Sequence, residues 1–200
     1  MQKYLALGDS YTIGEGVLPQ ASFPYILVHE LAQLGYEYNQ PDVIAKTGWT
    51  TDELQEAIND TKPHANYDLV SLLIGVNNQY RQYPLPQYQA EFASLLSQSI
   101  TFAQGRKEKV FVLSIPDWGQ TPFAQQSDRQ IDIIAQEIDA YNAIAADYCK
   151  SEGVQFIDIT GYTRNLAQYQ APLVSDGLHY ATEMHTEWVK AILSSPLTFG

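Results

Sequence analysis

Five short apolar runs alternate with longer segments of helical periodicity, and this alternation limits the folds open to the chain more than any other feature. The runs cover residues 4–7, 42–46, 68–74, 109–115 and 154–159. Each has the length of a strand, and the third is almost wholly apolar, as in a strand covered on both faces. Strands that alternate with helices favour a parallel sheet with helices on both sides. We therefore expect an α/β fold with a five-stranded parallel sheet.

The helical segments are marked by apolar residues three and four apart and by signals at their ends. Thr50 or Thr51 precedes two acidic residues, as an N-cap precedes a negatively charged first turn. Ser127 or Asp128 is the expected N-cap of the longest helix. The predicted helices cover residues 23–34, 52–59, 85–104, 128–150 and 181–193.

Composition and charge exclude several classes of protein. The 200 residues can bury one sizeable core, and a hydrophobic content of 45% argues against disorder. Since no repeat or linker-like segment is visible, we expect one domain over residues 1–200. Cys149 is the only cysteine, so no disulfide can form within the chain. The formal net charge of −12 repels phosphate backbones and anionic bilayers, so we expect neither nucleic-acid binding nor stable membrane association.

The N-terminal residues carry no visible export signal. The chain opens with Met1-Gln2-Lys3 and enters an apolar run at once, without the small-residue cleavage site of a signal peptide. The longest apolar run, residues 69–76, is too short to span a bilayer. We expect a cytoplasmic protein, or one whose export leader has been removed. The oligomeric state is left open.

In parallel α/β folds, ligands bind beyond the carboxyl ends of the strands, so the loops at those ends are where chemistry is expected. Glycine in such a loop lets the backbone approach a ligand closely. The loops that follow the predicted strands, together with the segment before the last helix, are Gly8–Tyr11, Thr47–Thr50, Gly75–Asn78, Pro116–Gly119 and Ser175–His179.

A serine, a histidine and an aspartate in these loops have the chemistry of an activated nucleophile. Ser10 follows the first strand, and a serine hydroxyl is a weak nucleophile until a base takes its proton. His179 is the only imidazole in these loops, and Asp176, three residues earlier, can orient its ring. The backbone N–H groups of Ser10 and Gly48 and the amide of Asn77 are candidate donors to an oxyanion. These groups predict an ester hydrolase.

Four sequence blocks also resemble those of the SGNH (GDSL-type) hydrolases, in the family's order and over nearly the whole chain. They are Ala6-Leu7-Gly8-Asp9-Ser10-Tyr11, Lys46-Thr47-Gly48-Trp49-Thr50-Thr51, Gly75-Val76-Asn77 and Asp176-Gly177-Leu178-His179. Tyr11 and Asn78 stand where the family often has Leu and Asp. These departures leave the substrate class open more than the activity.

The resemblance implies a flavodoxin-like, three-layer α/β/α fold and hydrolysis of carboxylic acid esters through an acyl-enzyme. Ser10 would be the nucleophile, His179 the base and Asp176 the residue that orients the base. The N–H groups of Ser10 and Gly48, with the Asn77 amide, would form the oxyanion hole. No cofactor is expected. No metal is expected either, because no His, Cys or carboxylate cluster has chelating spacing.

Aromatic residues near these loops are candidate walls of a substrate pocket: Tyr11, Trp49, Tyr80 and Trp118. Short loops leave no room for a large lid, so we expect an open pocket for a small ester, with short acyl chains favoured. A lysophospholipase or thioesterase remains an alternative. A carbohydrate deacetylase, with Tyr80 and Tyr83 as sugar platforms, is another.

Two alternatives lie outside this class of enzyme. One is a catalytically silent binding module on the same fold, and the presence of every site residue argues against it. The other is a flavin-binding protein, which the acidic Asp9 in the first loop disfavours. We expect Asp9 to anchor its loop through backbone N–H groups. The remaining histidines, His29, His64 and His185, and the lone Cys149 are expected to be structural.

Overall fold

Five parallel strands form one sheet in the order β2-β1-β3-β4-β5. The computed structural model describes residues 1–165 and 173–200. Its strands are β1 (Tyr4–Gly8), β2 (Asp42–Ala45), β3 (Leu69–Leu73), β4 (Val110–Leu113) and β5 (Gln155–Ile157). The chain runs outward from β1 to β2 and then crosses to β3 on the other side of β1. This reversal is a switch point, the place where such sheets bind ligands.

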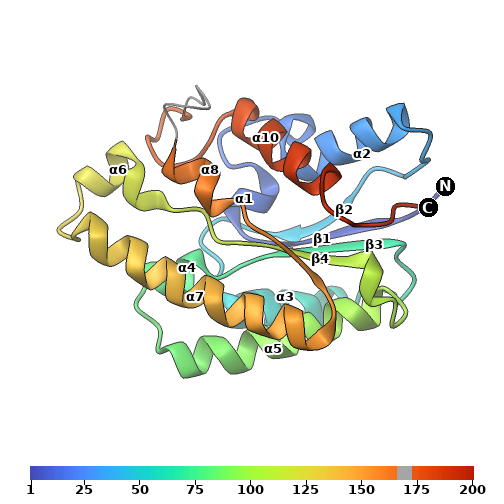
Figure 1. Ribbon diagram of the computed structural model, residues 1–200, viewed down its shortest axis with the longest axis horizontal. Helices are drawn as coiled ribbons and strands as arrows, with labels where there is room; N and C mark the ends of the chain where they lie inside the picture. Colours follow the sequence, from blue (N-terminus) through green and yellow to red (C-terminus); the bar gives the residue numbers. More distant parts are fainter. Residues whose placement is uncertain (166–172) are drawn as a thin grey trace.

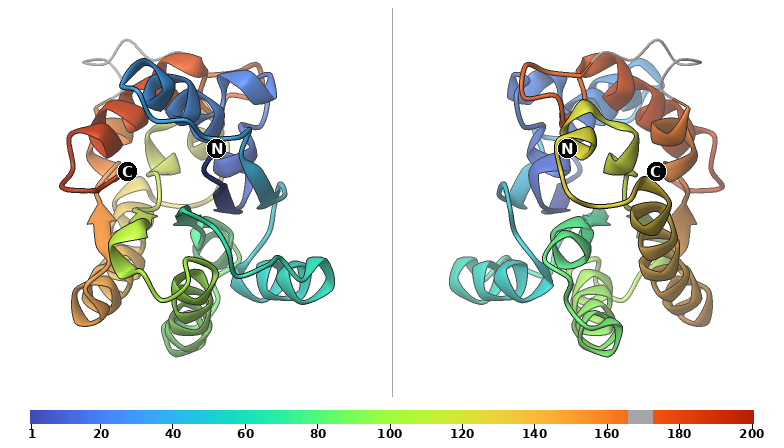
Figure 2. Two further views of the ribbon diagram at one scale, coloured as in Figure 1. Left: turned by 90° about the vertical axis from the view of Figure 1, so that its right-hand side faces the viewer. Right: turned by 90° about the vertical axis from the view of Figure 1, so that its left-hand side faces the viewer.

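Helices cover both faces of the sheet, which confirms the expected α/β/α architecture (Figures 1 and 2). On one face lie α2 (Phe23–Gln33) and α10 (Thr182–Leu193). On the other lie α3 (Thr51–Thr61), α5 (Leu85–Phe102) and α7 (Ile131–Glu152). Shorter elements follow the strands or join the longer helices: α1 (Ser10–Ile13), α4 (Val76–Tyr80), α6 (Pro122–Gln125), α8 (Thr160–Arg164) and the 3₁₀ turns η1 (Pro19–Ala21), η2 (Lys107–Lys109) and η3 (Trp118–Gln120).

The predicted elements are all present, and their ends differ where local signals mislead. Of the two candidate caps of α3, Thr50 is the N-cap, and it forms a capping box with Glu53. The expected cap of α7 is wrong: that helix begins at Ile131 with Gln130 as its N-cap. Ser127 instead donates to the Ala124 carbonyl at 2.7 Å, so it closes the turn after α6. The four- and five-residue helices α1 and α4 are too short to show a periodicity and were not predicted.

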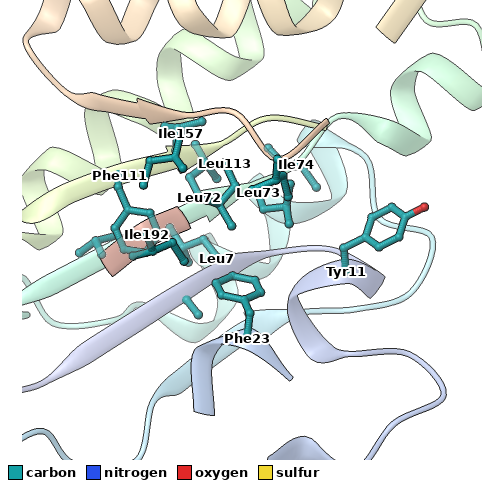
Figure 3. Packing of buried hydrophobic residues seen from close by; sticks show 14 of the residues in the cluster. Leu7, Tyr11, Phe23, Leu72, Leu73, Ile74, Phe111, Leu113, Ile157 and Ile192 are labelled. Atoms are coloured by element: carbon teal, nitrogen blue, oxygen red, sulfur yellow. The ribbon is translucent and has the colours of Figure 1, made fainter. Parts of the chain in front are cut away.

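The core lies on both sides of the three central strands, whose residues are all buried. Figure 3 shows Leu7, Leu72 and Phe111 from neighbouring strands in one cluster with Phe23 of α2 and Ile192 of α10. Burying a side chain of this size stabilises the fold by about 1.5–3 kcal/mol, so the sheet is a rigid base for the loops at its ends. No helix in the described part of the chain has the length and apolar character needed to cross a membrane.

Candidate active site

Ser10 stands at the first residue of α1, directly beyond β1. Gly8 ends that strand, and a Cβ there would lie 2.4 Å from the Leu73 carbonyl oxygen of β3, so only glycine fits. Asp9 is the N-cap of α1, and its Oδ1 accepts from the Tyr11 N–H at 3.0 Å. Asp9 therefore anchors the turn, as expected, and leaves Ser10 only 3% exposed at the wall of a pocket.

His179 and Asp176 reach Ser10 from the loop before α10, at the far end of the sequence. The His179 Nε2 lies 2.9 Å from the Ser10 Oγ, and its Nδ1 lies 2.6 Å from the Asp176 Oδ2. The Asp176 Oδ1 accepts from the N–H groups of Leu178 at 2.8 Å and of His179 at 2.9 Å. The three side chains thus form a line in which an imidazole can take a serine proton while a carboxylate holds its other nitrogen.

The hydrogen bonds around Asp176 keep its carboxylate ionised. Partial burial opposes the charge, but the bonds from the His179 ring and from the two backbone N–H groups outweigh it and lower the pKa of Asp176. A carboxylate in this state can stabilise the positive charge that develops when the imidazole accepts a proton.

The loop between β2 and α3 brings Gly48 to the same pocket. Gly48 has a φ of +86°, a left-handed conformation that favours glycine. Space is not the reason for glycine here, because a Cβ would lie 3.7 Å from the Arg81 guanidinium, its nearest neighbour. Residues of α4 and the position after it hold this loop: Arg81 Nη2 donates to the Gly48 carbonyl at 2.7 Å, and Asn77 Nδ2 donates to the Trp49 carbonyl at 2.9 Å.

The expected oxyanion donors border the same pocket. Ser10, Gly48 and Asn77 all line the pocket. Within the described residues, the backbone N–H groups of Ser10 and Gly48 have no acceptor, and the Asn77 amide keeps one hydrogen beyond its bond to Trp49. These three donors are therefore available to an acceptor in the pocket, as an oxyanion hole requires.

The pocket has a volume of about 150 Å³ and a largely apolar wall. Tyr80 and Trp118 line it as predicted, and their rings pack edge to face at 5.4 Å. Tyr11 also borders it, but its ring is buried and stacks on Tyr180 at 5.7 Å. Trp49 does not line the pocket. The lining residues that sequence reasoning missed are Thr47, Val76, Phe123 and Leu178.

Of the four residues expected to be structural, His185 and Cys149 are buried, whereas His29 and His64 lie on the surface. His185 is buried against Trp188, with ring centroids 4.9 Å apart, and burial, with the nearby His179, lowers the pKa of His185 to about 3. Cys149 is buried on α7, and burial raises the pKa of its thiol to about 12. Among the described residues, no three His, Cys, Asp or Glu side chains are grouped so that they could hold a metal ion.

Asp9 predicts a pH dependence of stability. Its Oδ2 is buried without a partner, and burial raises the pKa of Asp9 to about 7 against the opposing hydrogen bond from Tyr11 N–H. The folded state thus keeps this proton up to about pH 7, whereas the unfolded chain releases it near its ordinary value of about 4. The unfolded state then binds fewer protons between these values, so the contribution of Asp9 to stability falls as the pH rises through this window.

Asp9→Asn keeps the N-cap acceptor and removes the charge. We expect its Tm to equal that of the wild type near pH 4 and to exceed it by roughly 5 °C at pH 8. Thermal unfolding at several pH values measures the difference, with the exposed Asp60→Asn as the control that should show none. A constant offset between Asp9→Asn and the wild type over this range would contradict the buried charge.

Comparison with known proteins gives a family and a fold. The model of the GDSL-like lipase/acylhydrolase family matches residues 6–186. One similar solved structure is TesA, with a TM-score of 0.75 and 18% sequence identity over 98% of this chain and 100% of that one. Another is the acetylxylan esterase Axe2 from Geobacillus stearothermophilus, with a TM-score of 0.72 and 18% identity over 96% of this chain and 92% of that one. A third is a lipase/acylhydrolase from Enterococcus faecalis, with a TM-score of 0.68 and 22% identity over 96% of this chain and 94% of that one. At these identities the structures show a shared fold. No curated protein sequence matches the chain.

Proposed function

Since this chain belongs to the GDSL-like lipase/acylhydrolase family and is a hydrolase of ester bonds, we propose that it is a serine esterase that removes short acyl groups from small esters. The observation that carries this proposal is the line from Asp176 through His179 to Ser10, which ends at a small aromatic pocket. The line supports nucleophilic catalysis, and the pocket supports a short acyl group.

The reaction proceeds in two halves. As His179 Nε2 takes the hydroxyl proton, the Ser10 Oγ attacks the ester carbonyl carbon and the carbonyl π electrons move to oxygen. The N–H groups of Ser10, Gly48 and Asn77 stabilise that oxyanion. Its collapse breaks the bond to the alcohol, which leaves with the proton from His179. Water, deprotonated by the same imidazole, then attacks the acyl-enzyme and releases the acid and Ser10.

The size of the pocket limits the acyl group. A cavity of about 150 Å³ accommodates a benzene-sized group, so an acyl chain of up to about six carbons fits. The rings of Tyr80, Trp118 and Phe123 provide an apolar surface for it. The long chain of a lysophospholipid would extend beyond this wall into solvent, which disfavours that alternative.

A specific observation favours deacetylation of a carbohydrate as the second candidate. Tyr80 is 46% exposed and borders the pocket, so part of its ring is free to stack on a sugar bound outside it. An acetyl group would occupy only part of the pocket. The name of the structurally similar Axe2 describes an acetylxylan esterase, which is consistent with this candidate.

A substrate panel tests the proposal. We expect kcat/KM for p-nitrophenyl esters to be highest at six acyl carbons or fewer and to fall beyond. An acetylated xylo-oligosaccharide assayed in parallel tests the deacetylase candidate, and a lysophospholipid tests the lipid one. A maximum at ten or more carbons would contradict the short-acyl assignment. Lack of turnover for every ester would favour the binding module.

Asn77→Ala is expected to lower kcat by about 10²- to 10³-fold with little change in KM, because an oxyanion donor acts mainly in the transition state. Steady-state kinetics on one short-chain ester measures this. Asn59→Ala, on the exposed face of α3, is the matched control. If Asn77 only supports its loop through the Trp49 carbonyl, the variant will instead show a lower Tm with near-normal kcat in the folded fraction.

A further inference from the structure

A chain of hydrogen bonds runs behind the aromatic wall of the pocket and ends at a surface ion pair. The Trp118 indole N–H donates to the Gln79 Oε1 at 2.8 Å, and the Gln79 Nε2 donates to the Glu137 Oε2 at 2.6 Å. Arg129 Nη2 donates to the same carboxylate oxygen. We call these four residues the Gln79 relay. They come from η3, α4, α7 and the loop before α7, so only the tertiary fold assembles them.

The relay has a fixed direction. An amide side chain can present either its oxygen or its nitrogen to a neighbour, whereas the ionised carboxylate of Glu137 only accepts. The amide nitrogen of Gln79 must therefore face Glu137, and its oxygen is left for the indole of Trp118. Gln79 is 1% exposed and Trp118 is 2% exposed, so water cannot easily replace either partner.

The relay bears on the pocket through Trp118. The indole packs edge to face against Tyr80 at 5.4 Å and Phe123 at 6.0 Å, and all three rings line the pocket. On its other side, Gln79 borders a second cavity of about 320 Å³, together with Glu137 and Tyr141. Without its bond to Gln79, the indole is no longer fixed against Tyr80 and Phe123, so the wall that limits the acyl chain can shift and admit a longer chain.

We propose that Gln79, held by Glu137 and Arg129, is a positioning residue that determines acyl-chain specificity by fixing the indole of Trp118. Gln79 follows Asn77 by two residues on α4, so one short helix carries both an oxyanion donor and the support of the acyl wall. The inference rests on the proposed esterase function, because it assumes that the acyl group occupies this pocket.

The test replaces the amide by a side chain of similar size that cannot accept the indole hydrogen bond. In Gln79→Leu we expect the ratio of kcat/KM for p-nitrophenyl octanoate to that for the butyrate to rise about tenfold or more, chiefly through KM. Gln87→Leu breaks a comparable bond to Glu91 on exposed α5 and should leave the ratio unchanged.

Exchanging the amide and the carboxylate between positions 79 and 137 tests whether the lost chain-length specificity can be restored. In the double variant Gln79→Glu/Glu137→Gln, the carboxylate accepts from both the indole and the new amide, while Arg129 donates to the amide oxygen. The double variant should restore the wild-type ratio, whereas Gln79→Glu alone places two carboxylates together and should not. A variant that merely loosened the fold would not be rescued in this way.

The outcomes separate the inference from the proposed function. A wild-type protein that hydrolyses none of these esters and does not react with a fluorophosphonate would overturn the function itself. An active wild type with an unchanged ratio in folded Gln79→Leu would overturn only the inference. If Gln79→Leu does not fold, Glu137→Gln is the second test. Without the carboxylate, the Gln79 amide can rotate and lose its bond to the indole, so the octanoate-to-butyrate ratio of kcat/KM should rise severalfold. A ratio equal to that of the wild type would overturn the inference.

Discussion

Ser10→Ala is expected to abolish covalent labelling by a fluorophosphonate and to lower kcat for short-chain esters by roughly 10⁴- to 10⁶-fold. The reason is that, in the proposed mechanism, the acyl-enzyme forms on the Ser10 Oγ at the end of the line from Asp176 and His179. The residual rate over water would come from the oxyanion donors and from binding alone. Mass spectrometry of the labelled protein and kinetics on one ester measure both effects.

Ser97→Ala is the matched control, since Ser97 is exposed on α5, far along the chain from every residue of the site. It should be labelled and should turn over ester like the wild type. Labelling of Ser10→Ala at the wild-type rate would show that another serine is the nucleophile and would reject the assignment of Ser10.

The second large effect concerns the coupling between Ser10 and His179. His179→Ala should lower kcat about as much as Ser10→Ala, because in the proposed mechanism one proton passes between them along the 2.9 Å hydrogen bond. The double variant should then be little worse than either single variant. Residues that act independently would give losses that multiply.

This comparison needs kcat for the two single variants and the double variant on one ester, with Tm values to show that each is folded. His29→Ala, a change to a histidine of α2 outside the pocket, is the control and should keep its activity. Losses that multiply would mean that Ser10 and His179 do not act on the same proton, and the proposed triad would be wrong.

The short helix α4 concentrates more of the site than its sequence suggests. It carries the oxyanion candidate Asn77, the wall residue Tyr80 and, between them, Gln79. Asn78, where the related family often has Asp, binds the backbone N–H of Thr51 at 3.0 Å and so joins α4 to the start of α3. Arg81, next after the helix, holds the Gly48 carbonyl. In the sequence these residues form only a polar and aromatic run with no detectable period.

The residues that form the apolar wall of the pocket were predicted less completely than the candidate catalytic residues. Tyr80 was predicted from the aromatic run that follows Asn77, and Trp118 from its place in a strand-end loop; both line the pocket. Trp49 also follows a strand end, directly after Gly48, but its side chain does not reach the pocket. Phe123 has no such signal: it belongs to α6, and its backbone N–H donates to the Gly177 carbonyl at 3.1 Å, which joins this helix to a loop far away in the sequence. Leu178 could have been suspected, because it lies between Asp176 and His179.

The amino-acid sequence alone was enough to predict the succession of strands and helices along the chain, the parallel sheet and the loops that carry Ser10, Gly48, Asn77, Asp176 and His179. These features depend on hydrophobic period and on loop residues at strand ends, which are local properties. The family model that matches residues 6–186 spans all four motif blocks. The side chains that share the pocket and the bonds that hold Trp118 in place could be identified only in the folded structure. Those features arise from packing and hydrogen bonds between α4, η3, α6 and α7, and no local pattern encodes a contact between segments that meet only when the chain has folded.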